Sequence, residues 1–106
     1  EHYLTVDSMT QFQNLLSNYE FVIVKFTADW CGPCKRIHPL FLALAEKNLE
    51  NDRVMFVSVD VDDSEDIAGQ CEVKAMPTFQ CYKEGKKIKE FSGASDEKLK
   101  SMVESV

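Results

Sequence analysis

The sequence predicts an α/β fold in which helices flank a mixed central sheet. Apolar, strand-like segments alternate with helical ones through most of the chain, which indicates crossover connections and parallel strands. A hairpin signal at 83–86, Lys-Glu-Gly-Lys, adds an antiparallel edge. The chain has 106 residues and no internal repeat or linker, so we expect residues 1–106 to form a single domain.

The first elements are expected to be a short strand at 3–6, a helix at 9–18 and a strand at 21–27. Ser8 precedes Gln11 by three residues, a spacing typical of a capping box at a helix start. The segment 21–27 is apolar almost without alternation, as in a strand that is buried on both faces.

A long helix is expected from Cys34 onward. Its apolar residues recur at helical spacing and form one stripe: Ile37, Leu40, Phe41, Leu44 and Ala45. Pro39 lies inside this segment and predicts a kink, because proline has no N–H to donate to the carbonyl one turn back.

The second half predicts a buried strand at 54–61, a short helix at 65–71 and hairpin strands at 77–82 and 87–91. Ser95 is a candidate N-cap, with Asp96 and Glu97 in the first turn, where negative charge suits the helix dipole. The apolar stripe of this last helix consists of Leu99, Met102, Val103 and Val106.

Charge and hydropathy exclude several classes of protein. The net charge is -6, which argues against binding to nucleic acid or to anionic membranes. The longest apolar run, 40–45, is far shorter than the ~18 residues of a membrane span. The chain opens at Glu1 without a secretory signal, so we expect the cytoplasm, or an organelle if a presequence was removed.

The four cysteines are Cys31, Cys34, Cys71 and Cys81. This density is well below the ~8–10% of a disulfide-stapled secreted scaffold. The cysteine count therefore favours a reducing compartment, in which a closely spaced pair serves chemistry and not structure.

Cys31 and Cys34 stand where the buried strand gives way to the long helix. A helix N-terminus favours a thiolate at Cys31, and one helical turn brings Cys34 within disulfide reach. Cys34 lies further into the first turn, so we expect it to be more buried than an exposed Cys31. This asymmetry suits a two-step exchange, in which an exposed thiolate attacks and a buried thiol resolves the mixed disulfide.

Two other uses of this cysteine spacing are disfavoured. A zinc site would need a second pair of ligands at similar spacing, and the histidines are only His2 and His38. Haem attachment would need a histidine after the second cysteine, where Lys35 stands. We therefore expect no metal.

The chain resembles the thioredoxin family nearly from end to end. The segments that carry the resemblance are WCGPCK at 30–35, VDVDD at 59–63, MPTF at 76–79 and FSGA at 91–94. The resemblance implies a thioredoxin fold of five strands and four helices and a protein-disulfide reductase that binds no cofactor. It also implies electrons from NADPH through thioredoxin reductase, disulfide-containing protein substrates and a monomeric chain.

The resemblance also implies roles for single residues. Cys31 is the expected nucleophile and Cys34 the resolving thiol, while Trp30 covers the site. Gly32 and Pro33 are the intervening pair typical of reducing members of the family.

Pro77 resembles the family's cis-proline, although from the residues alone it could be an ordinary trans turn proline. With Trp30, Met76, Gly93 and Ala94 it would form a groove for an extended substrate segment.

Asp62 has two interpretations. It matches the family position whose carboxylate can hold the indole N–H of Trp30, and it also fits a solvated acid in the acidic stretch 60–66. That stretch could have a secondary role in steering basic partners.

Lys25 departs from the family pattern. Thioredoxins commonly bury an aspartate at this position behind the second cysteine, and a lysine that often pairs with it falls on Ser58 here. Lys25 could extend its ammonium to water, stay charged and stabilise both thiolates, or act as a neutral base for Cys34.

The remaining candidates have simpler interpretations. Cys71 is either a regulatory thiol or a half-buried small residue, and Cys81 is expected to be an inert core thiol. His38 is expected to be a surface histidine. Two other functions stay open on sequence alone: a redox-regulated binding module, and an oxidant or isomerase.

Overall fold

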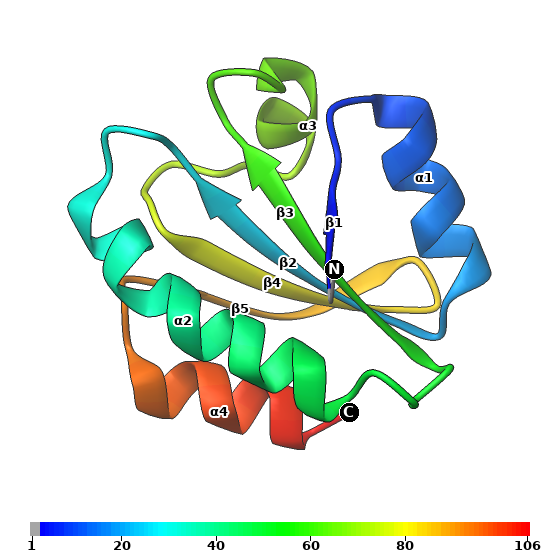
Figure 1. Ribbon diagram of the computed structural model, residues 1–106. Helices are drawn as coiled ribbons and strands as arrows, with labels where there is room; N and C mark the ends of the chain where they lie inside the picture. The colour runs from blue at the N-terminus through cyan, green and yellow to red at the C-terminus, as the bar shows by residue number, and fades with distance from the viewer. Residues whose placement is uncertain (1–2) are drawn as a thin grey trace.

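The computed structural model describes residues 3–106, so His2 lies outside the described residues. Within them, helices cover both faces of a five-stranded sheet (Figure 1). In chain order the elements are β1 (Leu4–Thr5), α1 (Met9–Asn18), β2 (Phe21–Thr27), α2 (Gly32–Lys47), β3 (Val54–Asp60), α3 (Glu65–Gln70), β4 (Thr78–Lys83), β5 (Lys86–Ser92) and α4 (Asp96–Glu104). This is the predicted order of elements.

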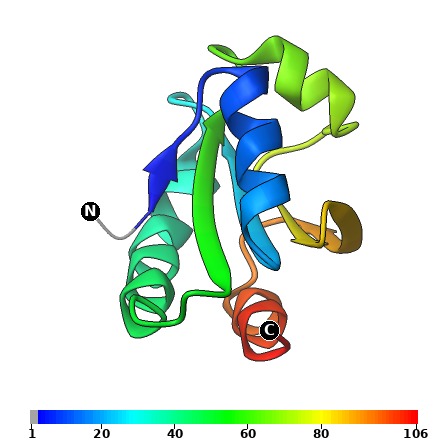
Figure 2. The same ribbon diagram turned by 90° about the vertical axis from the view of Figure 1, so that its right-hand side faces the viewer.

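The sheet is mixed, as predicted. Its strand order is β1-β3-β2-β4-β5; β3 pairs parallel with β1 and β2, whereas β4 pairs antiparallel with β2 and β5. Helices α2 and α4 pack on one face, and α1 and α3 lie on the other (Figure 2). The parallel half follows from the helical crossovers, and the antiparallel half from the hairpin.

Strand β2 is buried on both faces, which confirms the prediction from its continuous apolar run. Phe21 and Ile23 belong to the core under α2 and α4, whereas Val22 and Val24 belong to the core under α1 and α3. Because side chains alternate along a strand, Lys25 points with Phe21 and Ile23 toward α2.

The two predicted N-caps are confirmed. Ser8 accepts a hydrogen bond from the N–H of Gln11 at 3.2 Å, and Ser95 accepts one from the N–H of Lys98 at 3.2 Å. Each cap satisfies a backbone donor that the first helical turn leaves without an intrahelical partner.

Several predicted boundaries differ from the observed ones by one or two residues, among them the start of α2 and both ends of β1. Helix α2 begins at Gly32 instead of Cys34, because Pro33 fits the first turn of a helix, where no N–H needs an acceptor. Strand β1 covers Leu4–Thr5 and not 3–6, although the N–H of Val6 still donates to the carbonyl of Ser58 at 2.9 Å. Helix α2 continues through Pro39 to Lys47.

The hairpin between β4 and β5 is tighter than predicted. Its loop has two residues, Glu84 and Gly85, with φ of 51° and 84°. Positive φ at both central positions is typical of a type I′ turn, whose twist matches that of paired strands. Strand β4 therefore extends to Lys83, and β5 starts at Lys86.

Candidate active site

A disulfide joins Cys31 and Cys34 where the chain leaves the carboxyl end of β2 and enters α2 (Figure 1). Their Cα atoms are 5.3 Å apart. Cys31 is the N-cap of α2, and its Sγ accepts a hydrogen bond from the N–H of Cys34 at 3.2 Å. The prediction that Cys31 stands at the helix N-terminus and pairs with Cys34 is confirmed.

The expected contrast between an exposed Cys31 and a buried Cys34 is not found. Cys31 is 4% exposed and Cys34 is 1% exposed. Both form a small apolar cluster with Ala28, against which Val61 and Met76 pack. In this disulfide form both residues are buried, so the predicted exposure of Cys31 is wrong.

Trp30 is 68% exposed beside the disulfide, and its indole is tied to the end of β3. Its Nε1–H donates to Oδ2 of Asp62 at 2.9 Å. The backbone N–H of Asp62 in turn donates to Oδ1 of Asp60 at 2.8 Å, which fixes the turn that carries the carboxylate. Of the two interpretations of Asp62, the structure supports the contact with Trp30.

The predicted groove residues come from two loops beside the cysteines. The Met76–Pro77 peptide bond is cis, which confirms the prediction for Pro77. The N–H of Gly93 donates to the carbonyl of Pro77 at 2.9 Å, and Gly93 has φ of 98°, which side-chain-bearing residues rarely adopt. Arg36 of α2 donates to the carbonyl of Ala94 at 2.9 Å, which joins this loop to the helix that carries Cys34.

Lys25 lies inside the molecule, between β2 and α2. Its side chain is 3% exposed, and its Nζ lies 2.5 Å from Nδ1 of His38. Burial lowers the pKa of Lys25 to about 8. The Lys25 side chain therefore ends against the His38 imidazole and not in open solvent.

His38 was expected to be a surface residue, and the structure makes it part of the site. It is half-buried, and with Lys25 and Cys34 it lines a cavity of about 230 Å³. The signal was available in the sequence, since residues four apart on a helix share a face and His38 follows Cys34 by four. Its partner Lys25 is 13 residues away on another element, which local spacing does not reveal.

Comparison with known proteins agrees with this geometry. The family model described as Thioredoxin matches residues 3–105. The chain belongs to the thioredoxin family.

The similarity to known thioredoxins extends over nearly the whole chain. Thioredoxin of Oryctolagus cuniculus is 51% identical over 100 residues, 92% of each chain. Oxidised mitochondrial thioredoxin 3 of Saccharomyces cerevisiae has a TM-score of 0.90 at 36% identity, covering 98% of this chain and 95% of that one. A chain from a study of thiol resolution in yeast mitochondrial 1-Cys peroxiredoxin via glutathione and thioredoxin systems has a TM-score of 0.85 at 36% identity, covering 98% and 95%.

The family match and the Cys31–Cys34 disulfide together establish the activity of this chain. The chain is a thiol–disulfide oxidoreductase, a protein-disulfide reductase of the thioredoxin type. The Cys31–Cys34 disulfide is the oxidised form of its redox-active pair. The reduced pair passes two electrons to a substrate disulfide and closes into this bond.

The other two cysteines are free and buried. Burial raises the pKa of the Cys71 thiol, whose Sγ accepts a hydrogen bond from the Tyr82 hydroxyl at 3.3 Å. A reactive cysteine needs a lowered pKa and access to solvent, whereas Cys71 is buried and its pKa is raised. Cys81 is fully buried in the core, and burial raises its pKa too, as expected for an inert thiol.

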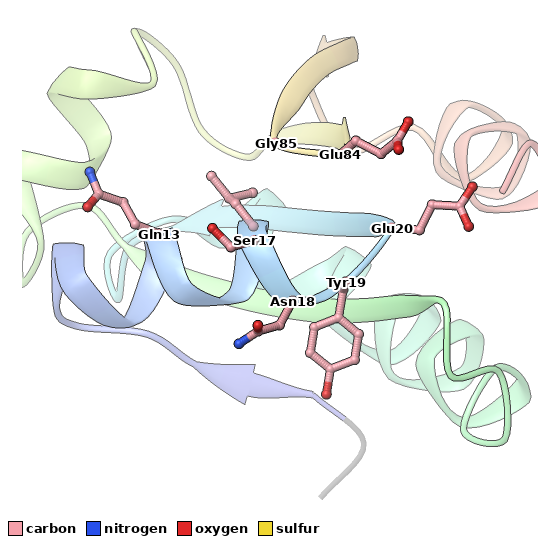
Figure 3. Close-up of a pocket in the computed structure, with 8 residues that line it drawn as sticks. Gln13, Ser17, Asn18, Tyr19, Glu20, Glu84 and Gly85 are labelled. Atoms are coloured by element: carbon pink, nitrogen blue, oxygen red, sulfur yellow. The ribbon is translucent and has the colours of Figure 1, made fainter.

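A larger hollow, of about 590 Å³, lies at the opposite end of β2 from the disulfide (Figure 3). Gln13 and Ser17 of α1 line one side of it, and Glu84 and Gly85 of the hairpin line the other. Glu20, also on its wall, is paired with Arg53 through Nε at 2.7 Å and Nη2 at 3.0 Å. Its lining residues contain no thiol.

Within residues 3–106, the structure gathers no group of three His, Cys, Asp or Glu side chains suited to hold a metal ion. None of the helices described there has the length and apolar character needed to cross a membrane.

Proposed function

We propose that Cys31 is the nucleophile and Cys34 the resolving thiol of this protein-disulfide reductase. The carrying observation is the position of Cys31 as the N-cap of α2, with its Sγ accepting the N–H of Cys34 at 3.2 Å. In the reduced protein the same donor and the helix dipole favour a thiolate at Cys31.

The proposed exchange has two steps. The Cys31 thiolate attacks one sulfur of the substrate disulfide, which forms a mixed disulfide and releases the other sulfur as a thiolate. Cys34 loses its proton and attacks Sγ of Cys31, which forms the Cys31–Cys34 bond and releases the second substrate thiolate. The dithiol is oxidised by two electrons, the substrate disulfide is reduced by two, and the substrate thiolates take protons from water.

We propose that the substrate lies as an extended segment across Trp30, Met76, Pro77, Gly93 and Ala94. Met76 packs against the apolar cluster of the two cysteines, and Gly93 is hydrogen-bonded to Pro77. A backbone held in this way offers its polar groups to an extended peptide, as in strand addition. Gly32 and Pro33 are exposed between the two buried cysteines, so the segment would also lie against their backbone.

Several properties of the proposed cycle come from the family. We propose that thioredoxin reductase returns the disulfide to the dithiol with electrons from NADPH, and that disulfide-containing proteins, a peroxiredoxin among them, are substrates. The chain would act as a single-domain monomer in cell redox homeostasis. The cytoplasm is the proposed compartment and an organelle the alternative, since one relative is mitochondrial by name.

Insulin reduction, followed by precipitation of the free chains, tests this function. With thioredoxin reductase and NADPH we expect sustained turnover by the wild type and by Cys71→Ala, and none by Cys31→Ser. Cys34→Ser should instead accumulate a covalent complex that dithiothreitol releases. Turnover with dithiothreitol but none with thioredoxin reductase and NADPH would reject only the proposed reductase. No turnover with either source of electrons would reject the function.

A further inference from the structure

The Lys25–His38 pair lies behind the resolving cysteine and has no role in the exchange as described so far. An ammonium can only donate, so Nδ1 of His38 must be the acceptor and the imidazole must be neutral, with its proton on Nε2. Burial and the charge of Lys25 lower the pKa of His38, which agrees with a neutral ring. The pair therefore holds one positive charge.

The surroundings of this charge are mostly apolar. Nζ of Lys25 lies 5.0 Å from the ring centre of Phe41 and 5.8 Å from that of Tyr3. In the sheet, Lys25 stands between Ser58 of β3 and Phe79 of β4, neither of which carries a charge. Its Nζ is therefore stabilised by ring faces and by one imidazole.

Lys25 is a buried cation without an ion pair to a carboxylate among residues 3–106. Neither of the ion pairs found within residues 3–106, Arg53–Glu20 and Lys87–Glu90, includes it. A buried cation without a carboxylate is costly, and a neighbouring anion would relieve that cost.

Such an anion can form at Cys34. Lys25, His38 and Cys34 line the same cavity, whose volume of about 230 Å³ suffices for a few water molecules at ~30 Å³ each. The other charged groups on its wall are Asp29 and Lys35, of opposite sign and both exposed at its mouth. When the Cys31–Cys34 bond opens, a thiolate at Cys34 would share this cavity with the buried ammonium.

We propose that the ammonium of Lys25, held by the imidazole of His38, stabilises the thiolate of Cys34 and so prepares it for the resolving attack. Lys25 and His38 are thus positioning residues, His38 acting only through Lys25. This inference rests on the proposed role of Cys34.

In the mixed disulfide the Cys34 thiol gives its proton to water in the cavity. The resulting thiolate, paired with the ammonium, attacks Sγ of Cys31 and displaces the substrate thiolate, which takes a proton from water. No electrons or bonds beyond those of the exchange are needed, and Lys25 keeps its charge throughout.

The Cys34 thiol pKa, measured by thiolate absorbance in a Cys31→Ser background, tests this pairing. Lys25→Met keeps an unbranched side chain that is one atom shorter and removes the charge. We therefore expect the Cys34 pKa to rise by about one, which gives a roughly tenfold smaller thiolate fraction at neutral pH. His38→Leu should raise it less, because an ammonium without its acceptor loses its proton more readily. His38→Asn keeps an acceptor near Nδ1 and should restore the wild-type value.

Two further variants separate this role from a merely structural one. Lys35→Met removes a cation at the exposed mouth of the same cavity and should change the Cys34 pKa by a few tenths at most. In the Lys25→Met protein, His38→Leu should have no further effect. An unchanged Cys34 pKa in Lys25→Met, or an undiminished effect of His38→Leu there, would overturn the inference, and the insulin assay reports separately on the proposed function.

Discussion

Lys25 is an ammonium enclosed between a sheet and a helix, and its charge has a cost for folding. Burial lowers its pKa to about 8, so the folded protein binds this proton less tightly than the unfolded chain does. The penalty is complete below about pH 8 and disappears as the pH rises toward the ordinary lysine value of about 10.5. Stability therefore increases with pH through this window.

We predict that Lys25→Met stabilises the oxidised protein at about pH 7, by up to about 2–3 kcal/mol. The full gain is reduced by the lost contacts with His38 and Phe41. Urea unfolding at about pH 7 and about pH 10 measures it, and the difference from the wild type should shrink at the higher pH. A gain that is independent of pH would mean that packing, and not charge, is responsible.

The stability of helix α4 depends on the N-cap of its first turn. Ser95 accepts the N–H of Lys98, and α4 contributes Leu99, Met102 and Val103 to the core shared with α2. Loss of the cap leaves a backbone donor of the first turn without its partner, which weakens the docking of the helix.

Ser95→Ala should lower the free energy of unfolding by about 1 kcal/mol in urea. Ser101→Ala is the matched control, because Ser101 is an exposed residue of the same helix. That substitution should be neutral or stabilising by a few tenths of a kcal/mol, since alanine is the better helix former. Equal losses in both variants would contradict the capping role.

The elements were predictable where the signal is local. The caps at Ser8 and Ser95 and the unbroken apolar run of β2 each lie within one short segment. The start of α2 was misplaced because Gly32 and Pro33 resemble turn residues, although proline suits a first helical turn.

Across the whole molecule, Phe41 connects α2 to the sheet. It is fully buried, and its ring lies 5.6 Å from that of Phe56 on β3, 6.1 Å from that of Phe79 on β4 and 5.7 Å from that of Tyr3. A residue in contact with several strands contributes to the whole cooperative unit.

Phe41→Leu should lower the free energy of unfolding by about 1–2 kcal/mol, because the smaller side chain leaves part of this space unfilled. Leu49→Ala, at a site that is 58% exposed, should change it by less than about 0.5 kcal/mol. Unfolding followed by far-ultraviolet circular dichroism measures both. A loss at Phe41 no larger than that at Leu49 would exclude this central packing role.

The site is built from residues of several distant elements, so the sequence could predict only part of it. The cysteine pair could be predicted from one short segment, whereas the contact between Lys25 and His38 depends on how α2 packs against β2. The burial of Cys31 depends likewise on Met76 from a distant loop. The family pattern indicated the positions of Pro77 and Asp62, and it offered no guide to Lys25, where this chain departs from it.

The exposed indole beside the disulfide provides an intrinsic fluorescence signal from the active site. The chain has one tryptophan, Trp30, next to Cys31 and tied to Asp62. Its emission therefore originates at the reactive end alone, without contributions from another indole in the core. Opening of the disulfide and docking of a tryptophan-free partner can both be followed by this intrinsic fluorescence, with no added label.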